Sequence, residues 1–488
     1  MSGKFWKYTF FIAFVLTAGR ALAQQASAVG ESDVIALTLR RNLGIQASAY
    51  NPQIAATEIT KAKSQFDTHL SGQAAFNLDR SDKTSIIFGT DNRTVLYEAR
   101  AEKKLPAGVQ GAISLSNQRD STNSAFATDP IFWETILRTE VSAPMLRNRF
   151  GKSDRALVSL SQAKQKVAAE QAYIVVQNQV AESLTQYWNW VATQYYFEVS
   201  RRFLKAARDF SDSTFRKKAL GLAEETDTLA AQSQVLEREA EVSRASNLVK
   251  TTEKRLRYLL DEALEGSWRS KDPLRGSPPK FSKADLLRQA LDSRPEYLSL
   301  RREVAAKDIQ IALAKDQTWP SLDLFTSLEL NSVDPNYGRA LGETWSAQHP
   351  NWLVGAQFKI DLENRFAKGE LDRSRLEKAQ VLVQLKETEN LIALEIDENW
   401  RQLLLQQKER DRYSQAARFQ NQKMNLEFEK YTSGRSDSDT IVRFQNDALA
   451  AERQRLEAEL RYRLAWVQLR KSVGAFVPNG KESALETR

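Results

Sequence analysis

The stretch LTQYWNWVATQY, residues 184–195, indicates how this chain folds, because its apolar side chains recur at the spacing of one helix face. Leu184, Tyr187 and Val191 step by three and four residues, which places them on one stripe of an α-helix. They lie inside a segment without glycine or proline, Lys152–Leu220. At about 1.5 Å per residue, this helix would be roughly 100 Å long, and no ordinary globular domain needs that length.

A second segment, Glu370–Ser433, is also free of glycine and proline and repeats the pattern. Its apolar stripe consists of Leu385, Ile392, Ile396, Trp400 and Leu403. Two such helices predict an elongated, mainly α-helical protein, in which the rest of the chain packs against them.

The N-terminus has the pattern of an export signal. Lys4 and Lys7 precede the apolar run Phe10–Ala18, and Ala21-Leu22-Ala23 fits a small-x-small cleavage site. The apolar run is too short to span a bilayer as a helix. We therefore expect residues 1–23 to be a signal peptide, with a retained signal anchor as the alternative. Later segments offer no run of eighteen apolar residues, so any further membrane contact is expected to be through strands.

The composition argues against several functional classes. The 488 residues include no cysteine and two histidines, His69 and His349, which leaves little for a thiolate site or a zinc site. The net charge is +8, but basic and acidic residues interleave along the helices, so we expect no nucleic-acid partner. Residues 150–153 lack the upstream glycine of a phosphate loop, and Ser161 with Lys164 matches a nucleophile pattern by spacing alone. We expect neither an enzyme nor a cofactor.

The mature sequence reads as two similar halves, each with a short helix, strands, a long helix, a turn and a medium helix. Asn148–Lys152 resembles Asn364–Lys368, and Gly221 with Asp227-Thr228-Leu229 resembles Gly434 with Asp439-Thr440-Ile441. The first half has an additional segment around a turn at Leu105–Gly108. The predicted boundaries are 24–265 for the first repeat, 266–281 for an irregular linker, 282–473 for the second repeat and 474–488 for the C-terminal tail.

The strand segments alternate apolar and polar side chains with a period of two. Runs of nine to eleven such residues fit strands that cross a bilayer, with the apolar side facing lipid; a soluble sheet packed on one face is the alternative. The segments that show the alternation most clearly are 70–78, 109–116, 133–141, 322–330 and 352–362.

One chain does not supply enough strands for a closed barrel. Two strands per half make four, or six if the additional hairpin joins, whereas a membrane barrel needs at least about eight. Open sheet edges are not tolerated in lipid, because their backbone groups are unpaired. We therefore expect closure by several copies; three copies with four strands each would supply twelve strands.

At this point the chain resembles the TolC family of outer-membrane efflux proteins. The resemblance covers nearly the whole mature chain, and the duplicated order of elements is its specific feature. The residues that carry it are the helix starts at Leu43 and Pro295, the strand-to-helix junctions 143–146 and 360–362, and the turns 219–222 and 431–436.

The resemblance implies a homotrimer whose β-barrel in the outer membrane continues as a long antiparallel α-helical, coiled-coil tunnel through the periplasm. Such a duct passes solutes or proteins, in efflux or type I secretion, from an inner-membrane pump and a periplasmic adaptor. It also implies that adaptor hairpins contact Gly221, Leu222, Gly434 and Ser436 at the helix tips. Ordinary turn chemistry is the alternative explanation for the two glycines.

The tips are rich in carboxylates, which a trimer would repeat around a narrow mouth, where they would attract cations. Helix caps and first-turn carboxylates are the alternative explanation, for Asp439 especially. Family members often place an aspartate one turn further into the last helix, where this chain has Arg443; our hypothesis is that Arg443 pairs with a tip carboxylate and helps to close the mouth. The residues predicted at the mouth are Asp227, Tyr431, Asp437, Asp439 and Arg443.

Two other functional classes are alternatives to the export duct. A periplasmic coiled-coil adaptor or scaffold would also contain long helical hairpins, but it would lack bilayer-length amphipathic strands in both halves. A secreted enzyme would need a constellation of reactive groups that the sequence does not show.

Overall fold

The computed structural model describes residues 27–276 and 282–476. The predicted signal peptide, residues 277–281 of the predicted linker and residues 477–488 of the predicted tail lie outside these ranges. No helix within them contains an apolar stretch that would suffice to cross a bilayer.

The described chain is mainly α-helical, as predicted. The two long helices coincide with the predicted ones, although α8 begins earlier than expected, at Arg365, and includes Gly369. The shorter α1 and α5 were not predicted as separate helices. The helices are α1 Glu31–Arg41, α2 Leu43–Lys63, α3 Lys152–Ala219, α4 Glu225–Leu259, α5 Lys283–Ser293, α6 Pro295–Gln317, α7 Tyr337–Trp345, α8 Arg365–Thr432 and α9 Ser438–Ser472.

The strands follow the predicted order, with two additions, β1 and β6, which are too short for a periodic pattern. Strand β3 is the first strand of the predicted additional hairpin, and the alternation gave no bounds for it. The strands are β1 Ser27–Val29, β2 Thr68–Asp79, β3 Asn92–Lys104, β4 Gln110–Thr122, β5 Ile131–Pro144, β6 Trp268–Ser270, β7 Ser321–Asp334 and β8 Pro350–Lys359.

The chain forms two compact units, each built from both halves of the sequence. We call the described parts of Met1–Asn42, Glu182–Pro278 and Gln406–Leu464 the helical unit. We call the described parts of Leu43–Ala181, Pro279–Leu405 and Ala465–Arg488 the sheet unit. The units cut across the two predicted repeats, so the repeat boundaries stay a prediction.

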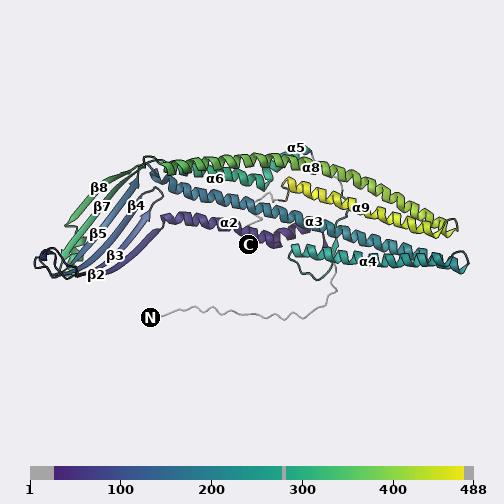
Figure 1. Ribbon diagram of the computed structural model, residues 1–488, viewed down its shortest axis with the longest axis horizontal. Coiled ribbons are helices and arrows are strands. Elements are labelled where there is room, and N and C mark those ends of the chain that lie inside the picture. Colours follow the sequence, from purple (N-terminus) through teal and green to yellow (C-terminus); the bar gives the residue numbers. More distant parts are fainter. Residues whose placement is uncertain (1–26, 277–281, 477–488) are drawn as a thin grey trace, which may run out of the picture. The chain divides into compact units, whose positions relative to one another are not determined.

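The sheet unit contains an antiparallel sheet with the strand order β2-β3-β4-β5-β7-β8 (Figure 1). The additional hairpin of the first half, β3 and β4, therefore lies within this sheet, between β2 and β5. Of the two strand counts that the sequence left open for one chain, the described residues show six.

The two faces of the sheet differ in chemistry, because side chains alternate along every strand. The register places Gly72, Ala99, Leu115, Leu137 and Leu330 in one row across the apolar face. On the opposite face Arg138 pairs with Glu329, and Arg100 pairs with Glu140 at 3.0 Å. This is the alternation that the sequence predicted for strands with one apolar and one polar side.

A short helix that was not predicted, α7, covers part of the apolar face near the β7–β8 connection. The rings of Tyr337 and Trp133 lie 5.0 Å apart, and the Thr344 hydroxyl donates to the Thr135 carbonyl at 3.1 Å. Ala340 and Thr344 form the buried side of this helix. With nine residues, α7 is too short to show a reliable helical repeat of apolar side chains in the sequence. It is identified only by its packing on β5 and β7.

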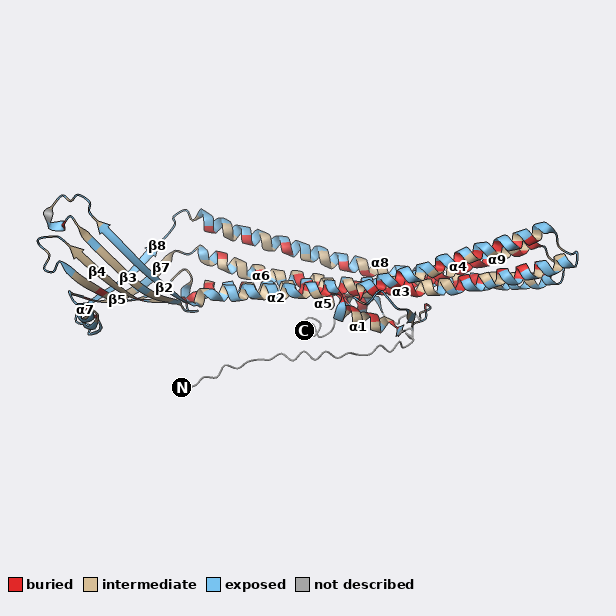
Figure 2. Ribbon diagram, turned by 90° about the horizontal axis from the view of Figure 1, so that it is seen from below, coloured by how far each residue is buried: buried red, intermediate tan, exposed pale blue. Residues whose placement is uncertain are grey.

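The core of the helical unit is formed by aromatic residues of α3. Tyr187, Trp188 and Trp190 are fully buried, and the Tyr187 hydroxyl donates to Asp272 at 2.7 Å. Figure 2 shows buried residues gathered where α1 lies beside α3. Strand β1 pairs in parallel with β6, so Trp268–Ser270 of the predicted linker is not irregular. This pairing joins residues far apart in sequence, and local patterns do not report it.

Candidate functional site

The predicted contact residues lie in two turns of the helical unit, between α3 and α4 and between α8 and α9. Both helices end in the same way: Leu222 N donates to the Lys217 carbonyl at 2.8 Å, and Arg435 N donates to the Lys430 carbonyl at 2.8 Å. These are the long hydrogen bonds of Schellman turns, in which a glycine in the left-handed region follows the helix. Gly221 has φ +70° and Gly434 has φ +74°.

The two glycines are therefore explained by backbone conformation. A Cβ atom at either position would meet no atom within 4 Å, so close packing does not demand glycine there. Leu220 and Leu222 beside the first turn are both more than 70% exposed. Leucines this exposed are apolar surface that the described residues leave uncovered, and contact with an adaptor stays a prediction.

Tyr431 joins the two helical hairpins next to these turns. It is 2% exposed and packs with Phe210, Ala231 and Ile441. Its hydroxyl lies 2.9 Å from the Thr214 hydroxyl and 3.4 Å from the Ser438 hydroxyl. The side chain thus links α8 to α3 by both apolar packing and hydrogen bonding.

Lys217, near the end of α3, contacts Tyr431 in two ways. Its Nζ lies 3.5 Å from the centroid of the Tyr431 ring and donates to the Tyr431 carbonyl. Burial lowers the pKa of Lys217, and the nearby charge of Asp227 opposes this effect. The attraction between a cation and an aromatic face offsets part of the cost of burying this charge, and the hydrogen bond to the Tyr431 carbonyl links α3 to α8.

A pocket of about 580 Å³ opens between the two turns. It brings together many of the residues predicted from the sequence and also contains Lys217. Gly221, Asp439 and Arg443 are not among its lining residues. The predicted residues that line it are Leu222, Asp227, Tyr431, Gly434, Ser436 and Asp437.

The carboxylates at the turns act as helix caps. Asp227 accepts from the Glu224 backbone N at 2.9 Å, and Asp437 accepts from Thr440 N at 2.8 Å. The hydrogen bonds from Thr440 lower the pKa of Asp437. Asp437 therefore caps α9, and Asp439 lies in the first turn of the same helix, which agrees with the alternative explanation of a first-turn carboxylate. Ser436 donates to Glu427 at 2.7 Å, which fixes the second turn to α8.

Arg443 does not form the ion pair that the sequence suggested within the described part of this chain. Its guanidinium lies 5.4 Å from the ring of the neighbouring Phe444. Its charge makes only a small contribution to the lowered pKa of Asp437. Six residues, about 1.7 helical turns, separate Arg443 from Asp437, and the guanidinium lies near the Phe444 ring instead.

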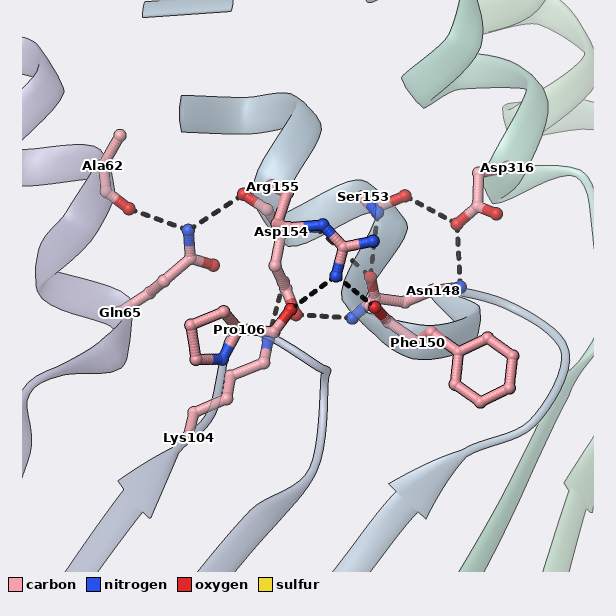
Figure 3. A network of polar contacts seen from close by, with 10 residues as sticks. All are labelled: Ala62, Gln65, Lys104, Pro106, Asn148, Phe150, Ser153, Asp154, Arg155 and Asp316. Atoms are coloured by element: carbon pink, nitrogen blue, oxygen red, sulfur yellow. Dashed lines mark hydrogen bonds and ion pairs between the residues drawn. The ribbon is translucent and has the colours of Figure 1, made fainter. Parts of the chain in front are cut away.

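A second polar network lies in the sheet unit, where the strands meet α3 (Figure 3). Asn148 caps α3, because its side-chain oxygen accepts from Ser153 N at 2.9 Å and Asp154 N at 3.2 Å. Lys104 at the end of β3 donates to Asp154 at 2.7 Å, and Arg155 donates to the Pro106 carbonyl at 2.8 Å. These contacts fasten the β3–β4 turn to the start of the long helix. We call this network the junction.

We call the two turns and the residues that contact them the tip. The sequence analysis did not identify four residues of the tip, namely Phe210, Thr214, Lys217 and Glu427. Lys217 stands four residues before the turn glycine, where a basic residue usually complements the helix dipole. Such a residue is common at a helix end, so its position alone does not point to Tyr431. Within the described ranges no cluster of histidine and acidic residues is arranged to hold a metal ion.

Sequence comparison finds no family model and no curated protein that matches this chain. Solved structures do match. The Campylobacter jejuni CmeC outer membrane channel has a TM-score of 0.65 at 13% identity, covering 91% of this chain and 85% of that one. The outer membrane protein VceC from Vibrio cholerae has a TM-score of 0.66 at 13% identity, covering 91% and 96%.

A third match is the open state of the Neisseria gonorrhoeae MtrE outer membrane channel. Its TM-score is 0.66 at 13% identity, and the alignment covers 93% of each chain. The fold of this chain is therefore that of outer-membrane channels, and the resemblance to the TolC family is confirmed at the level of the fold.

Proposed function

We propose that this protein is the outer-membrane exit duct of a multi-component export system. Three copies assemble into a β-barrel in the outer membrane and a helical tunnel in the periplasm. The duct passes solutes or proteins to the exterior, as in efflux or type I secretion. A periplasmic adaptor and an inner-membrane pump deliver the cargo.

The observation that carries this proposal is the fold, which combines long helical hairpins with an amphipathic antiparallel sheet and matches outer-membrane channels over more than nine-tenths of the chain. A scaffold made of helical hairpins would have no use for a sheet with one apolar and one charged face. The sheet provides a lipid-facing surface and a polar lining.

At the periplasmic end we assign the mouth to the turns that surround Tyr431. The contacts of Tyr431 with Thr214 and Lys217 hold the α8–α9 hairpin against the α3–α4 hairpin. Opening the mouth requires these hairpins to separate, which breaks those contacts. The pocket lined by Leu222, Gly434 and Ser436 is the proposed contact surface for the adaptor.

The experiment is to express the complete chain in a Gram-negative host, fractionate the envelope and measure the mass of the purified particle. We expect a detergent-resistant trimer in the outer-membrane fraction that forms ion-conducting channels in planar bilayers. A soluble periplasmic monomer without conductance would contradict the proposal and favour the adaptor or scaffold.

A further inference from the structure

The feature that goes beyond an ordinary export duct is the β3–β4 hairpin. It is paired along its whole length on both sides: β3 with β2 over Asn92–Lys103, and β4 with β5 over Gln110–Ser121. A hairpin that served as a flap or a plug would leave at least one of these strands without a partner. The hairpin is therefore part of the wall of the sheet.

The hairpin places apolar side chains on the apolar face of the sheet and charged side chains on the polar face. Ala99 and Leu115 extend the apolar row between Gly72 and Leu137. On the other face, Arg100 of β3 reaches across β4 to pair with Glu140 of β5 at 3.0 Å. The same assignment of apolar and polar sides thus holds for every strand of the sheet.

The turn of the hairpin is built into the junction. The Cβ of any residue replacing Gly151 would lie 2.2 Å from the Pro106 carbonyl oxygen, and one replacing Gly108 would lie 2.7 Å from Gly151 N. The backbones approach this closely only because both residues are glycine. The Lys104–Asp154 ion pair and the bond from Arg155 to Pro106 complete the attachment.

The edges of the sheet indicate what completes it. Within the described chain β2 and β8 each have one neighbour, and nearly every residue of both is exposed. Neither strand has a lysine, arginine or proline in its interior, although such residues normally protect an edge. Because β2 leads away from α2 and β8 leads back toward α8, the β8 of a second copy can pair with β2 in antiparallel fashion.

We propose that three copies close a barrel of eighteen strands, in which every copy contributes six, including the β3–β4 hairpin. This inference rests on the trimer of the proposed function. The interface is head-to-tail and closes into a ring, since each copy offers one β2 edge and one β8 edge.

The strand number sets the width of the pore. With strands about 4.8 Å apart and tilted by about 40°, eighteen strands form a barrel about 36 Å across, against about 24 Å for twelve. The four helices of each copy that connect directly to the sheet make twelve, and at about 9 to 10 Å apart they form a ring about 36 Å across. The additional hairpin therefore matches the barrel to the width of the helical ring, and the barrel leaves an open aqueous channel, as other barrels of this size do.

Cysteine cross-linking in the complete, membrane-embedded protein tests the inference, because the chain has no cysteine of its own. Gly72, Ala99 and Leu137 share one row of the apolar face. The Gly72→Cys/Ala99→Cys pair joins neighbouring strands and is expected to form a disulfide. In the Gly72→Cys/Leu137→Cys pair the residues are separated by three strand spacings, about 14 Å, which no disulfide spans.

The interface between copies is tested with Gly72→Cys or Ala74→Cys, each combined with a cysteine at Trp352, Val354, Ala356 or Phe358 of β8. We expect at least one combination to give cross-linked trimers on oxidation. A disulfide between positions 72 and 137 in a trimer, or no cross-link between β2 and β8 in any combination, would overturn the eighteen-strand barrel. Absence of the trimer itself, seen by native mass measurement, would instead contradict the proposed function.

A second measurement compares pore width directly. A variant lacking residues 91–123 removes β3 and β4 but keeps the antiparallel alternation of β2 and β5. Ser327→Cys, on the polar face, reports access from outside the cell to maleimide-polyethylene glycols of increasing size. We expect the complete chain to be labelled by larger polymers than the shortened one; equal cut-offs in the two trimers would contradict a wider barrel.

Discussion

The junction and the tip both lie at an end of α3, and both depend on glycines with positive φ, yet they are built in opposite ways. At the junction, Gly108 and Gly151 touch each other's backbone, and polar bonds surround them. At the tip, Gly221 and Gly434 face open space. The first arrangement resists movement because any displacement creates a clash or an unpaired group. The second tolerates movement, which agrees with the proposed role of these turns at a mouth that opens.

The largest difference between the two regions is expected for alanine at these glycines. Gly151→Ala places a Cβ against the Pro106 carbonyl in an unfavourable backbone conformation, and should cost about 3 kcal/mol or more. Gly434→Ala carries only the conformational cost, about 1 kcal/mol. The temperature at which the assembled protein unfolds measures the loss of stability in both variants. Equal losses would show that the close approach at the junction does not matter.

The next largest effect is expected for the ion pair of the junction. Asp154→Asn removes the charge that faces Lys104, at a site where the Asp154 side chain is 11% exposed, and should cost about 1–3 kcal/mol. Asp308→Asn is the matched control, because Lys378 and Lys104 are equally exposed whereas the Asp308 side chain is 55% exposed, and pairs with such an exposed partner contribute about 0.5 kcal/mol or less. Urea unfolding measures the free energy of unfolding of both variants. An equal loss of stability in Asp308→Asn and Asp154→Asn would show that the ion pair of the junction contributes no more than a solvated one.

At the tip we expect a smaller change in stability but a visible change in gating. Tyr431→Phe keeps the ring and removes the hydroxyl that faces Thr214 and Ser438, at a cost of about 1 kcal/mol to the closed arrangement. The open fraction in planar bilayers should rise by several-fold. Tyr258→Phe, at a tyrosine that is 78% exposed, should behave like the unmodified protein. An unchanged open fraction for Tyr431→Phe would speak against a role in closure.

The smallest effect is expected from the protonation of Lys217. Burial lowers its pKa in the folded tip, so the unfolded or open chain binds the proton more readily. The closed tip should therefore become more stable as the pH rises from the lowered pKa of Lys217 toward about 10.4, the pKa of a free lysine. Lowering the pH through the same range should reverse this gain. Channel recordings between pH 8 and 10, compared with Lys217→Met, measure this. The same pH dependence in the Met variant would assign it to another group.

Much of the fold follows from local periodicity. The apolar stripe around Tyr187 predicted α3 almost to the residue, and the alternation around Leu137 and Leu328 predicted β5 and β7. The turn at Gly434 was also predictable, since a glycine after a long helix has one preferred conformation. These features depend on residues that are close in sequence.

Other features were not predictable in this way. The alternation in β3 is weak because alanines occupy much of its apolar side, and only its pairing with β2 and β4 identifies it as a strand. The contact between Lys217 and Tyr431 joins residues more than two hundred positions apart. Arg443 lies near the ring of Phe444 within the described part of this chain, so its pairing with a tip carboxylate stays a prediction.

The sequence by itself determined the two long helices, five strands of the sheet and the apolar side of each, because these properties arise from side-chain spacing along one element. Only the tertiary structure decided that β3 and β4 belong to the wall of the sheet and that Tyr431 joins two hairpins. The physical reason is that strand pairing and side-chain packing are non-local: their free energy depends on partners that only the folded chain brings together.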